Sequence, residues 1–463
     1  MVGGNRIAAG VAAVVLAVSG GHAVGLADAP APPPLSQSPP LPLLDAAAAP
    51  SIDPGVLRSV LTPLLADPAL GPNPGAVVLD GITGQSLLEQ AADTAVTPAS
   101  SLKIATALAA LSALGPQHVL RTSVLRDESG IVLVGGGDPT LLTVPAASPP
   151  VFAPPPTLSD LAAQTAAALQ ADGIASVVVR YDASLFTGPA LSPDWDPTFV
   201  GLGIISPVSA LTVDPASRDI DPNALDADPA AATAAWFVAR LNSLGIVADL
   251  AGAGTAGTAG EEIAAVASAP VAALVDRMLD ISDNDVAEAL FRLAAIEAGL
   301  PGSFEGGSRV VADTFAQLQV PTPGLVIRDG SGLSRQNRIA PITLAASLRI
   351  AIDPAADVLR GVAGADLSAV TWLPPGLPVG GFSGSLDDRY DSATTSAGAG
   401  RVHAKTGTLT GVTSLSGVVA THQARPAVLV VLGDQTADTL AAREALDRVA
   451  AQIAACGCAA ATP

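Results

Sequence analysis

The chain of 463 residues contains only two lysines, Lys103 and Lys405, although it has 22 lysine and arginine residues together. Lys103 ends the sequence Ser-Ser-Leu-Lys at 100–103, and Lys405 begins the sequence Lys-Thr-Gly-Thr at 405–408. An amine can lose its proton inside a protein, whereas a guanidinium stays charged. The two lysines therefore indicate positions where the chemistry excludes arginine. If both serve one site, the fold must bring two distant segments together.

The spacing of Ser100 and Lys103 is that of a nucleophile and its base. The pattern predicts a helix over about 100–114, and residues three apart share a helix face, so hydroxyl and amine can meet. A lysine can activate a serine when burial or a second positive charge lowers its pKa from about 10.4. Lys405 is the candidate for that second charge. Ser101 is the rival nucleophile, but a spacing of two places it on a different face.

A third motif, Ser282-Asp283-Asn284, lies between helices expected at 271–279 and 285–298. Ser282 would pass a proton from the nucleophile to the leaving group, and Asn284 would bind amide groups of a substrate. Each motif alone fits an N-capped helix, a polar turn or a strand end. However, each of the three motifs occurs once, and they follow one another in the order S-x-x-K, S-D-N and K-T-G. This combination favours one catalytic site.

The segment Lys405–Thr408 is expected to be a strand that pairs with the substrate backbone. Gly407 would let the substrate approach the strand closely. The backbone N–H groups of Ser100 and Thr408 would form an oxyanion hole. Thr406 and Lys405 would hold a carboxylate of the substrate.

Composition excludes several other functions. Hydrophobic residues make up 49% of the chain and charged residues 14%, which is typical of a globular protein. A net charge of −20 argues against nucleic-acid binding, which needs clustered basic residues. A Ser-His-Asp triad is disfavoured because no G-x-S-x-G elbow accompanies the histidines, and His403 is interpreted as a packing or rim residue. No metal motif is present and no cofactor is expected; the glycines at 135–137 are interpreted as a structural turn.

Both ends of the chain carry particular features. Residues 1–29 combine Arg6, an apolar stretch and an Ala-Asp-Ala cleavage sequence, which predicts a signal peptide. The alternative is an uncleaved membrane anchor, and either one places the folded part outside the cytoplasm. Residues 30–50 are interpreted as a Pro/Ala-rich linker. Near the C-terminus, Cys456 and Cys458 could form a local disulfide, link the tail elsewhere or have no function.

The rest of the chain divides into three parts. A hairpin at 75–89 and the helix that begins near Ser100 belong to a first part, 51–116. In the next part, 117–265, short strands expected at 121–125, 131–134 and 176–181 alternate with loops. Ala-rich helices at 158–171 and 230–244 complete this mixed α/β region. Within 266–463 the pattern predicts helices, then antiparallel strands at 405–409, 415–419 and 427–432, and a covering helix at 438–455.

The motifs resemble those of the D-alanyl-D-alanine carboxypeptidase/endopeptidase family of penicillin-binding proteins, the low-molecular-mass type with a large insertion in the catalytic domain. The matching segments cover nearly all of the chain after the linker. They are 98–103, 135–141, 181–186, 282–288, 329–335, 377–381 and 405–411, and three of them contain the motifs above. One departure is Ser385, where the family more usually has threonine; both side chains carry a hydroxyl.

The resemblance implies a penicillin-recognising serine transpeptidase/β-lactamase-like fold, with a five-stranded antiparallel sheet flanked by helices. Residues 51–116 and 266–463 would form the catalytic domain, and 117–265 the insertion. Asp329, Ser331 and Ser334 would lie in a loop near the site, with a structural role. The implied partners are peptidoglycan stem peptides and β-lactams. The rivals are a β-lactamase, for which no deacylating glutamate is evident, and a non-catalytic wall-binding scaffold.

Overall fold

The structure is a computed structural model that describes residues 49–146, 154–213, 223, 227–257, 260–353 and 367–458, all within the compact unit Leu41–Pro463. The expected signal peptide, 1–29, and all but the last two residues of the expected linker, 30–50, lie outside the described residues. In the described part, no helix has the length and apolar character needed to cross a membrane.

A five-stranded antiparallel sheet joins the two ends of the described chain, in the order β2-β1-β10-β9-β8. The N-terminal hairpin adds to the C-terminal strands because β1 pairs with β10, from Gly75 opposite Leu432 to Asp80 opposite Ala427. β8 is an edge strand that pairs only with β9 within the sheet. The strands are β1 (Gly75–Asp80), β2 (Ser86–Gln90), β8 (Val402–Leu409), β9 (Val412–Ala420) and β10 (Pro426–Asp434).

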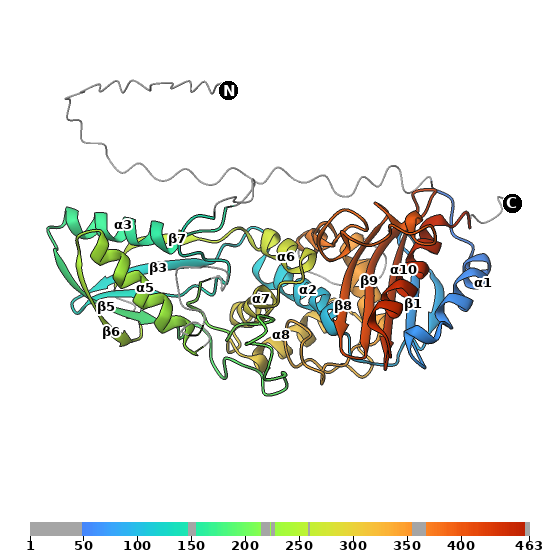
Figure 1. The fold of residues 1–463 in the computed structure, drawn as a ribbon, viewed down its shortest axis with the longest axis horizontal. Helices are drawn as coiled ribbons and strands as arrows, with labels where there is room; N and C mark the ends of the chain where they lie inside the picture. Colours follow the sequence, from blue (N-terminus) through green and yellow to red (C-terminus); the bar gives the residue numbers. More distant parts are fainter. Residues whose placement is uncertain are drawn as a thin grey trace, which may run out of the picture. The chain divides into compact units, whose positions relative to one another are not determined.

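Helices cover both faces of this sheet (Figure 1). One face packs on α1 (Pro54–Leu65) and α10 (Thr439–Ala455), through residues such as Leu61 and Leu446. The other face contributes to a larger core whose centre is α2 (Lys103–Leu114). Around α2 lie α6 (Val271–Asp280), α7 (Asn284–Glu297), α8 (Phe304–Gln317) and α9 (Pro341–Ile352). Small alanine side chains let α2 pack closely on all sides, which explains why nine of its residues, Lys103–Leu111, are buried.

A second sheet lies within the central third of the chain, in the order β6-β5-β4-β3-β7. The pairs β4–β5 and β5–β6 are parallel, whereas β3 pairs antiparallel with β4 and β7. The helices α3 (Leu158–Ala171) and α5 (Pro229–Ser243) pack against this sheet and form a hydrophobic core with it, in which Phe237 is fully buried. The strands are β3 (Arg121–Asp127), β4 (Gly130–Val134), β5 (Ser176–Asp182), β6 (Val247–Ala253) and β7 (Glu261–Ala267).

The sequence patterns located most of these elements but missed four of them. α3 has the expected bounds, and the strand and helix positions after 400 agree within a few residues. The helices α1 and α8 and the strands β6 and β7 were not foreseen. β6 and β7 are Ala-containing edge strands with one buried residue each, Ala248 and Ala264, so they lack the buried alternation that marks a strand.

Candidate active site

Ser100 lies in a tight 3₁₀ turn, Ala99–Leu102, that runs directly into α2. The preceding residue, Ala99, has a φ of 50°, in the left-handed region that side chains other than glycine rarely adopt. Gly332 packs against this backbone: a Cβ at Gly332 would lie 2.0 Å from the Ala99 carbonyl oxygen. The strained turn is thus held in place by a neighbouring loop, as is common at functional sites.

The amine of Lys103 is fully buried and has three polar neighbours. Its Nζ lies 3.1 Å from Ser100 Oγ, 2.6 Å from Asn284 Oδ1 and 2.8 Å from the carbonyl oxygen of Ser331. Asn284 is held in this orientation because its Nδ2 donates to the carbonyl oxygen of Ile204 at 2.8 Å. The structure therefore brings together three of the segments that the sequence singled out.

These neighbours suit a neutral amine. The oxygens of Asn284 and Ser331 can only accept, so they take the two N–H bonds of an uncharged Lys103. The lone pair then faces Ser100, whose hydroxyl is the one neighbour that can donate. Ser101 is not an equivalent candidate, because its Oγ lies 2.8 Å from Ser414 Oγ and bonds there instead.

Burial lowers the pKa of Lys103 to about 8, while the nearby carboxylates of Glu288, Asp329, Asp283 and Asp285 oppose this shift. The repulsion between the two lysine charges is mutual, and Lys405 is the one that gives up its charge more easily. Burial first, and then the charge of Lys103, hold the pKa of Lys405 well below its ordinary value. The reason is that the four carboxylates favour the charge on Lys103, whereas only Asp280 favours it on Lys405.

The Ser282-Asp283-Asn284 motif forms the turn between α6 and α7. Asp283 is the N-cap of α7, because its carboxylate accepts from the Val286 N–H at 3.0 Å. Asn284 is therefore the first helical residue and points to Lys103. Ser282 has a φ of 62° and is half-buried, and its hydroxyl has no hydrogen-bond partner within the described residues. The turn brings Asn284 to Lys103, whereas Ser282 stands free.

A buried carboxyl group that the motifs did not single out lies behind this arrangement. Glu288, one turn into α7, accepts from the backbone N–H groups of Gly330 and Ser331, the latter at 2.8 Å. Burial, followed by the charge of Asp329, raises the pKa of Glu288 to about 7. The carbonyl oxygen of the same residue, Ser331, contacts Lys103. Glu288 thus positions the loop that contacts the base.

The strand β8 places Lys405–Thr408 beside Ser100. A Cβ at Gly407 would lie 2.2 Å from Ser414 Oγ and 2.7 Å from the Pro98 carbonyl oxygen, so glycine lets β8 approach the backbone at Pro98 and Ser100. Lys405 is fully buried and its Nζ donates to the Thr406 carbonyl oxygen at 3.0 Å. Thr406 donates to the hydroxyl of Ser385 at 2.8 Å.

Among the described residues, the outer edge of β8 has no backbone hydrogen-bond partner after Ala404. The Ala404 N–H donates to the carbonyl oxygen of Pro378 on that side. Since successive residues of a strand point their N–H groups to alternate edges, those of Thr406 and Thr408 also face outward. The site therefore offers a free strand edge beside the Ser100 nitrogen.

The inserted region also reaches the site, which the sequence patterns did not indicate. Trp195 Nε1 donates to Asp329 at 2.8 Å, and the Ser206 N–H donates to Asp285 at 2.9 Å. Together with the Ile204 contact to Asn284, these bonds hold the segment 195–206 against the loop and α7. The only hint of this contact in the sequence was Trp195 itself, because aromatic residues make up just 3% of the chain.

Other residues singled out in the sequence have structural surroundings. The glycine-rich turn at 135–137 is tightly packed, since a Cβ at Gly136 would lie 1.9 Å from the Arg121 carbonyl oxygen. Burial lowers the pKa of His403, which lies on β8. Cys456 and Cys458 are paired in a disulfide, with their Cα atoms 5.0 Å apart. The structure therefore shows the local disulfide, rather than a link to another part of the chain or two free thiols.

The fold is that of a penicillin-binding protein. The structure is similar to penicillin binding protein 4 (dacB) from Haemophilus influenzae, with a TM-score of 0.68 at 21% identity, over 86% of this chain and 98% of that one. The same protein complexed with a novel β-lactam gives a TM-score of 0.63 over 84% and 97% of the two chains. The predicted fold class is confirmed.

The sequence identifies the family within this fold class. The profile of the D-Ala-D-Ala carboxypeptidase 3 (S13) family matches residues 57–226 and 224–453. A carboxypeptidase of Mycobacterium tuberculosis is 34% identical, over 95% of this chain and 92% of the relative. Carboxypeptidase DacB of Mycolicibacterium smegmatis is also 34% identical, over 98% of each chain. The chain belongs to the S13 family and is a serine-type D-Ala-D-Ala carboxypeptidase, which confirms the resemblance stated above.

Proposed function

We propose that this protein is an exported enzyme that trims peptidoglycan stem peptides through an acyl-enzyme on Ser100. The observation that carries the proposal is the buried amine of Lys103, which lies 3.1 Å from Ser100 Oγ and has its other two contacts to oxygens that only accept. A buried lysine with a pKa of about 8 can release its proton near neutral pH, as a general base must.

In the first half-reaction, Ser100 Oγ attacks the carbonyl carbon between two D-alanines while Lys103 takes the hydroxyl proton. The carbon–nitrogen bond then breaks, and the proton passes through Ser282 to the leaving amine. Asn284 binds the substrate amide. Water then hydrolyses the acyl-enzyme and restores Ser100. The free hydroxyl of Ser282 supports its role as the relay.

The open edge of β8 supports substrate binding by strand addition. The Ser100 and Thr408 N–H groups would stabilise the oxyanion, since the approach of Gly407 brings the two backbones together. Thr406 and Lys405 would hold the terminal carboxylate. A bound carboxylate would raise the pKa of Lys405 and restore its positive charge.

Export rests on the sequence of residues 1–29, which has the three parts of a secretory signal. An extracytoplasmic location fits a peptidoglycan substrate. The alternative of an uncleaved anchor leads to the same compartment. Cleavage of cross-bridges, an endopeptidase reaction, uses the same bond type and is included in the proposal.

A fluorescent penicillin tests the acyl-enzyme. We expect the full chain to be labelled covalently and to lose the label slowly, whereas Ser100→Ala takes up none. Ser112→Ala, an exposed change on the same helix, is the matched control and should label normally. Label that survives Ser100→Ala, or an unlabelled wild-type protein, would refute the proposal. Fast turnover of the penicillin would instead identify a β-lactamase.

A further inference from the structure

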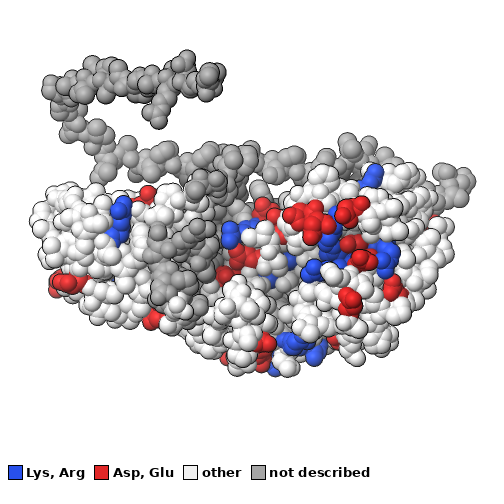
Figure 2. Space-filling model, in the orientation of Figure 1, with Lys and Arg blue, Asp and Glu red and all other residues white. Residues whose placement is uncertain are grey.

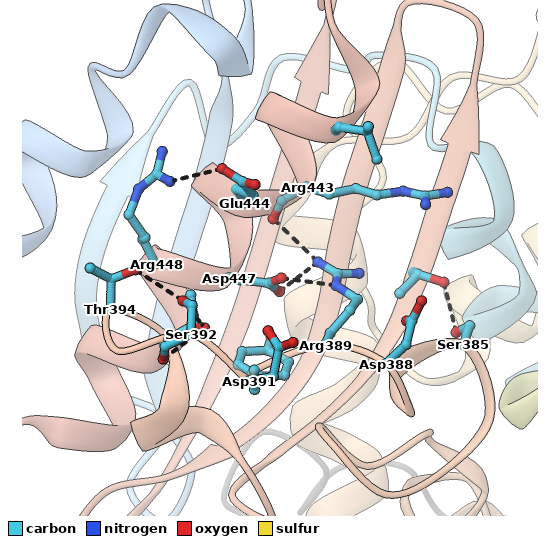
Figure 3. A pocket seen from close by; sticks show the side chains of 14 residues that line it. Ser385, Asp388, Arg389, Asp391, Ser392, Thr394, Arg443, Glu444, Asp447 and Arg448 are labelled. Carbon is cyan, nitrogen blue, oxygen red and sulfur yellow. Dashed lines mark hydrogen bonds and ion pairs between the residues drawn. The ribbon is translucent and has the colours of Figure 1, made fainter.

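A pocket of about 450 Å³ adjoins β8 on the side that faces α10 (Figure 3). Its walls come from the segment 385–395, from the first turns of α10 and from Thr406. Thr406 is also the residue proposed to hold the substrate carboxylate. The pocket therefore begins where the leaving residue of a bound peptide would lie and extends away from it.

Three arginines line this pocket, and two of them are neutralised. Arg389 pairs with the buried carboxylate of Asp447, with Nε 3.0 Å from Oδ2. Arg448 pairs with Asp67 at 2.7 Å and lies 3.8 Å from Glu444. Charged side chains of both signs gather over this part of the surface (Figure 2).

Arg443, the third arginine, has no carboxylate within 4.0 Å among the described residues. Its side chain stretches from α10 across the strand ribbon (Figure 3), and its Nη2 lies 3.4 Å from the hydroxyl oxygen of Thr408. Its backbone carbonyl is held by Arg389, which donates to it at 3.3 Å. An unpaired guanidinium thus lies at the strand edge proposed to bind substrate. A guanidinium can form two parallel hydrogen bonds with one carboxylate.

The opposite wall carries unpaired negative charge. Asp388 and Asp391 are exposed and take part in no ion pair within the described chain. Asp388 lies next to Ser385, below the outstretched Arg443 in Figure 3. Cavities that hold small-molecule ligands measure roughly 300–1,000 Å³, so this pocket has room for more than a single D-alanine.

We propose that this pocket is a subsite for the leaving residue, in which Arg443 joins Thr406 and Lys405 in binding the α-carboxylate and Asp388 receives a cationic side chain. The subsite rests on the proposed function, because it needs a peptide bound along β8. It selects leaving D-amino acids with long basic side chains, whose free side-chain amine pairs with Asp388. Arg443 and Asp388 determine specificity and take no part in the bond-breaking steps.

The test of Arg443 separates binding from chemistry. With an N-acylated peptide ending in D-Ala-D-Ala, we expect Arg443→Ala to raise KM by about fivefold while kcat stays near that of the wild type, as an exposed ion pair predicts. Arg443→Lys should recover part of the loss, and high salt should weaken the wild type toward Arg443→Ala. Arg309→Ala, an exposed arginine on α8, is the control.

The test of Asp388 compares leaving residues. We expect the wild type to release D-lysine from a peptide ending in D-Ala-D-Lys with a kcat/KM above that for D-alanine, and Asp388→Asn to reduce this ratio by about fivefold. For a peptide ending in D-Ala-D-Glu, Asp388→Asn should instead raise kcat/KM relative to that for D-alanine, because a negative charge is removed from the pocket. The subsite alone is overturned if the wild type releases D-alanine but Arg443→Ala leaves KM unchanged and Asp388→Asn leaves the ratio of the two kcat/KM values unchanged. A wild type that releases no D-amino acid overturns the proposed function as well.

Discussion

Two fully buried lysines lie in one site and differ in their neighbours. Lys103 has two accepting oxygens, the Ser100 hydroxyl and four carboxylates that keep its pKa at about 8. Burial and the charge of Lys103 lower the pKa of Lys405, and the carboxylate of Asp280 opposes this shift. The same residue type can therefore serve as a base at one position and as a carboxylate ligand at the other.

Exchanging each lysine for arginine separates these roles. Lys103→Arg should abolish acylation by penicillin, because a guanidinium cannot take the Ser100 proton. Lys405→Arg still supplies a positive charge for the carboxylate and should be milder, limited by the shape of the buried site. The measurement is the second-order rate of acylation. Equal and nearly normal rates in both variants would show that the base is assigned wrongly.

The acylation rate should also depend on pH through Lys103. Only the neutral amine can accept the proton, and its pKa is about 8, so activity is present above that pH and lost as the pH falls through it. Well below pH 8 the rate should change about tenfold per pH unit. Stopped-flow acylation between pH 6 and 9 is the measurement, with Ser112→Ala as the control. A flat profile would contradict this assignment.

At the scale of elements, the site depends on where secondary structures begin and end. Ser100 precedes α2 in a 3₁₀ turn, Asn284 is the first residue of α7, and Gly407 lies within edge strand β8. Asp283 links element and site, because it caps α7 and pairs with Arg277 at 2.7 Å. The start of α7 thus fixes the position of Asn284 relative to Lys103.

Removing this cap should destabilise the protein and disturb the site. Asp283→Ala should lower the free energy of unfolding by about 1–2 kcal/mol, because the Val286 N–H loses its acceptor. Asp283→Asn retains an equally good capping group and should cost about 1 kcal/mol less. Urea unfolding followed by circular dichroism measures both. Equal losses in the two variants would mean that the ion pair with Arg277, rather than the cap, stabilises the turn.

At the scale of the described molecule, the inserted region is tied to the catalytic site. The segment 195–206 contributes Trp195 to the loop at Asp329 and Ile204 to the amide of Asn284. Trp195 also packs edge-on against Phe304 of α8, with ring centroids 5.4 Å apart. A region inserted between Lys103 and Asn284 therefore helps to position both of them.

Trp195→Phe should loosen this link. The change keeps most of the aromatic surface but removes a donor from the buried Asp329, so we expect a loss of about 1–2 kcal/mol in unfolding free energy. Trp236→Phe on α5 is the matched control, since the Trp236 indole makes no hydrogen bond among the described residues. Urea unfolding of both variants is the measurement. Equal losses would show that the Asp329 bond contributes nothing.

Much of the fold was accessible from local patterns. Apolar runs with turn residues between them located β1, β2, β9 and β10, and Ala-rich stretches with Gly or Asp at their ends located α2, α3 and α10. β6 was missed because its side chains are mostly exposed on an edge strand, and α1 because Pro63 interrupts its helical pattern. Short-range periodicity reports burial, so elements with little burial leave a weak signal.

The sequence by itself determined which residue types the site contains, because S-x-x-K, S-D-N and K-T-G are local patterns with their own chemistry. It also excluded nucleic-acid binding through its charge. Only the tertiary structure decided that burial lowers the pKa of Lys103, that Glu288 supports the loop at Ser331, and that Arg443 remains unpaired beside Thr408. Burial and charge pairing depend on residues far apart in the chain, and no local pattern records them.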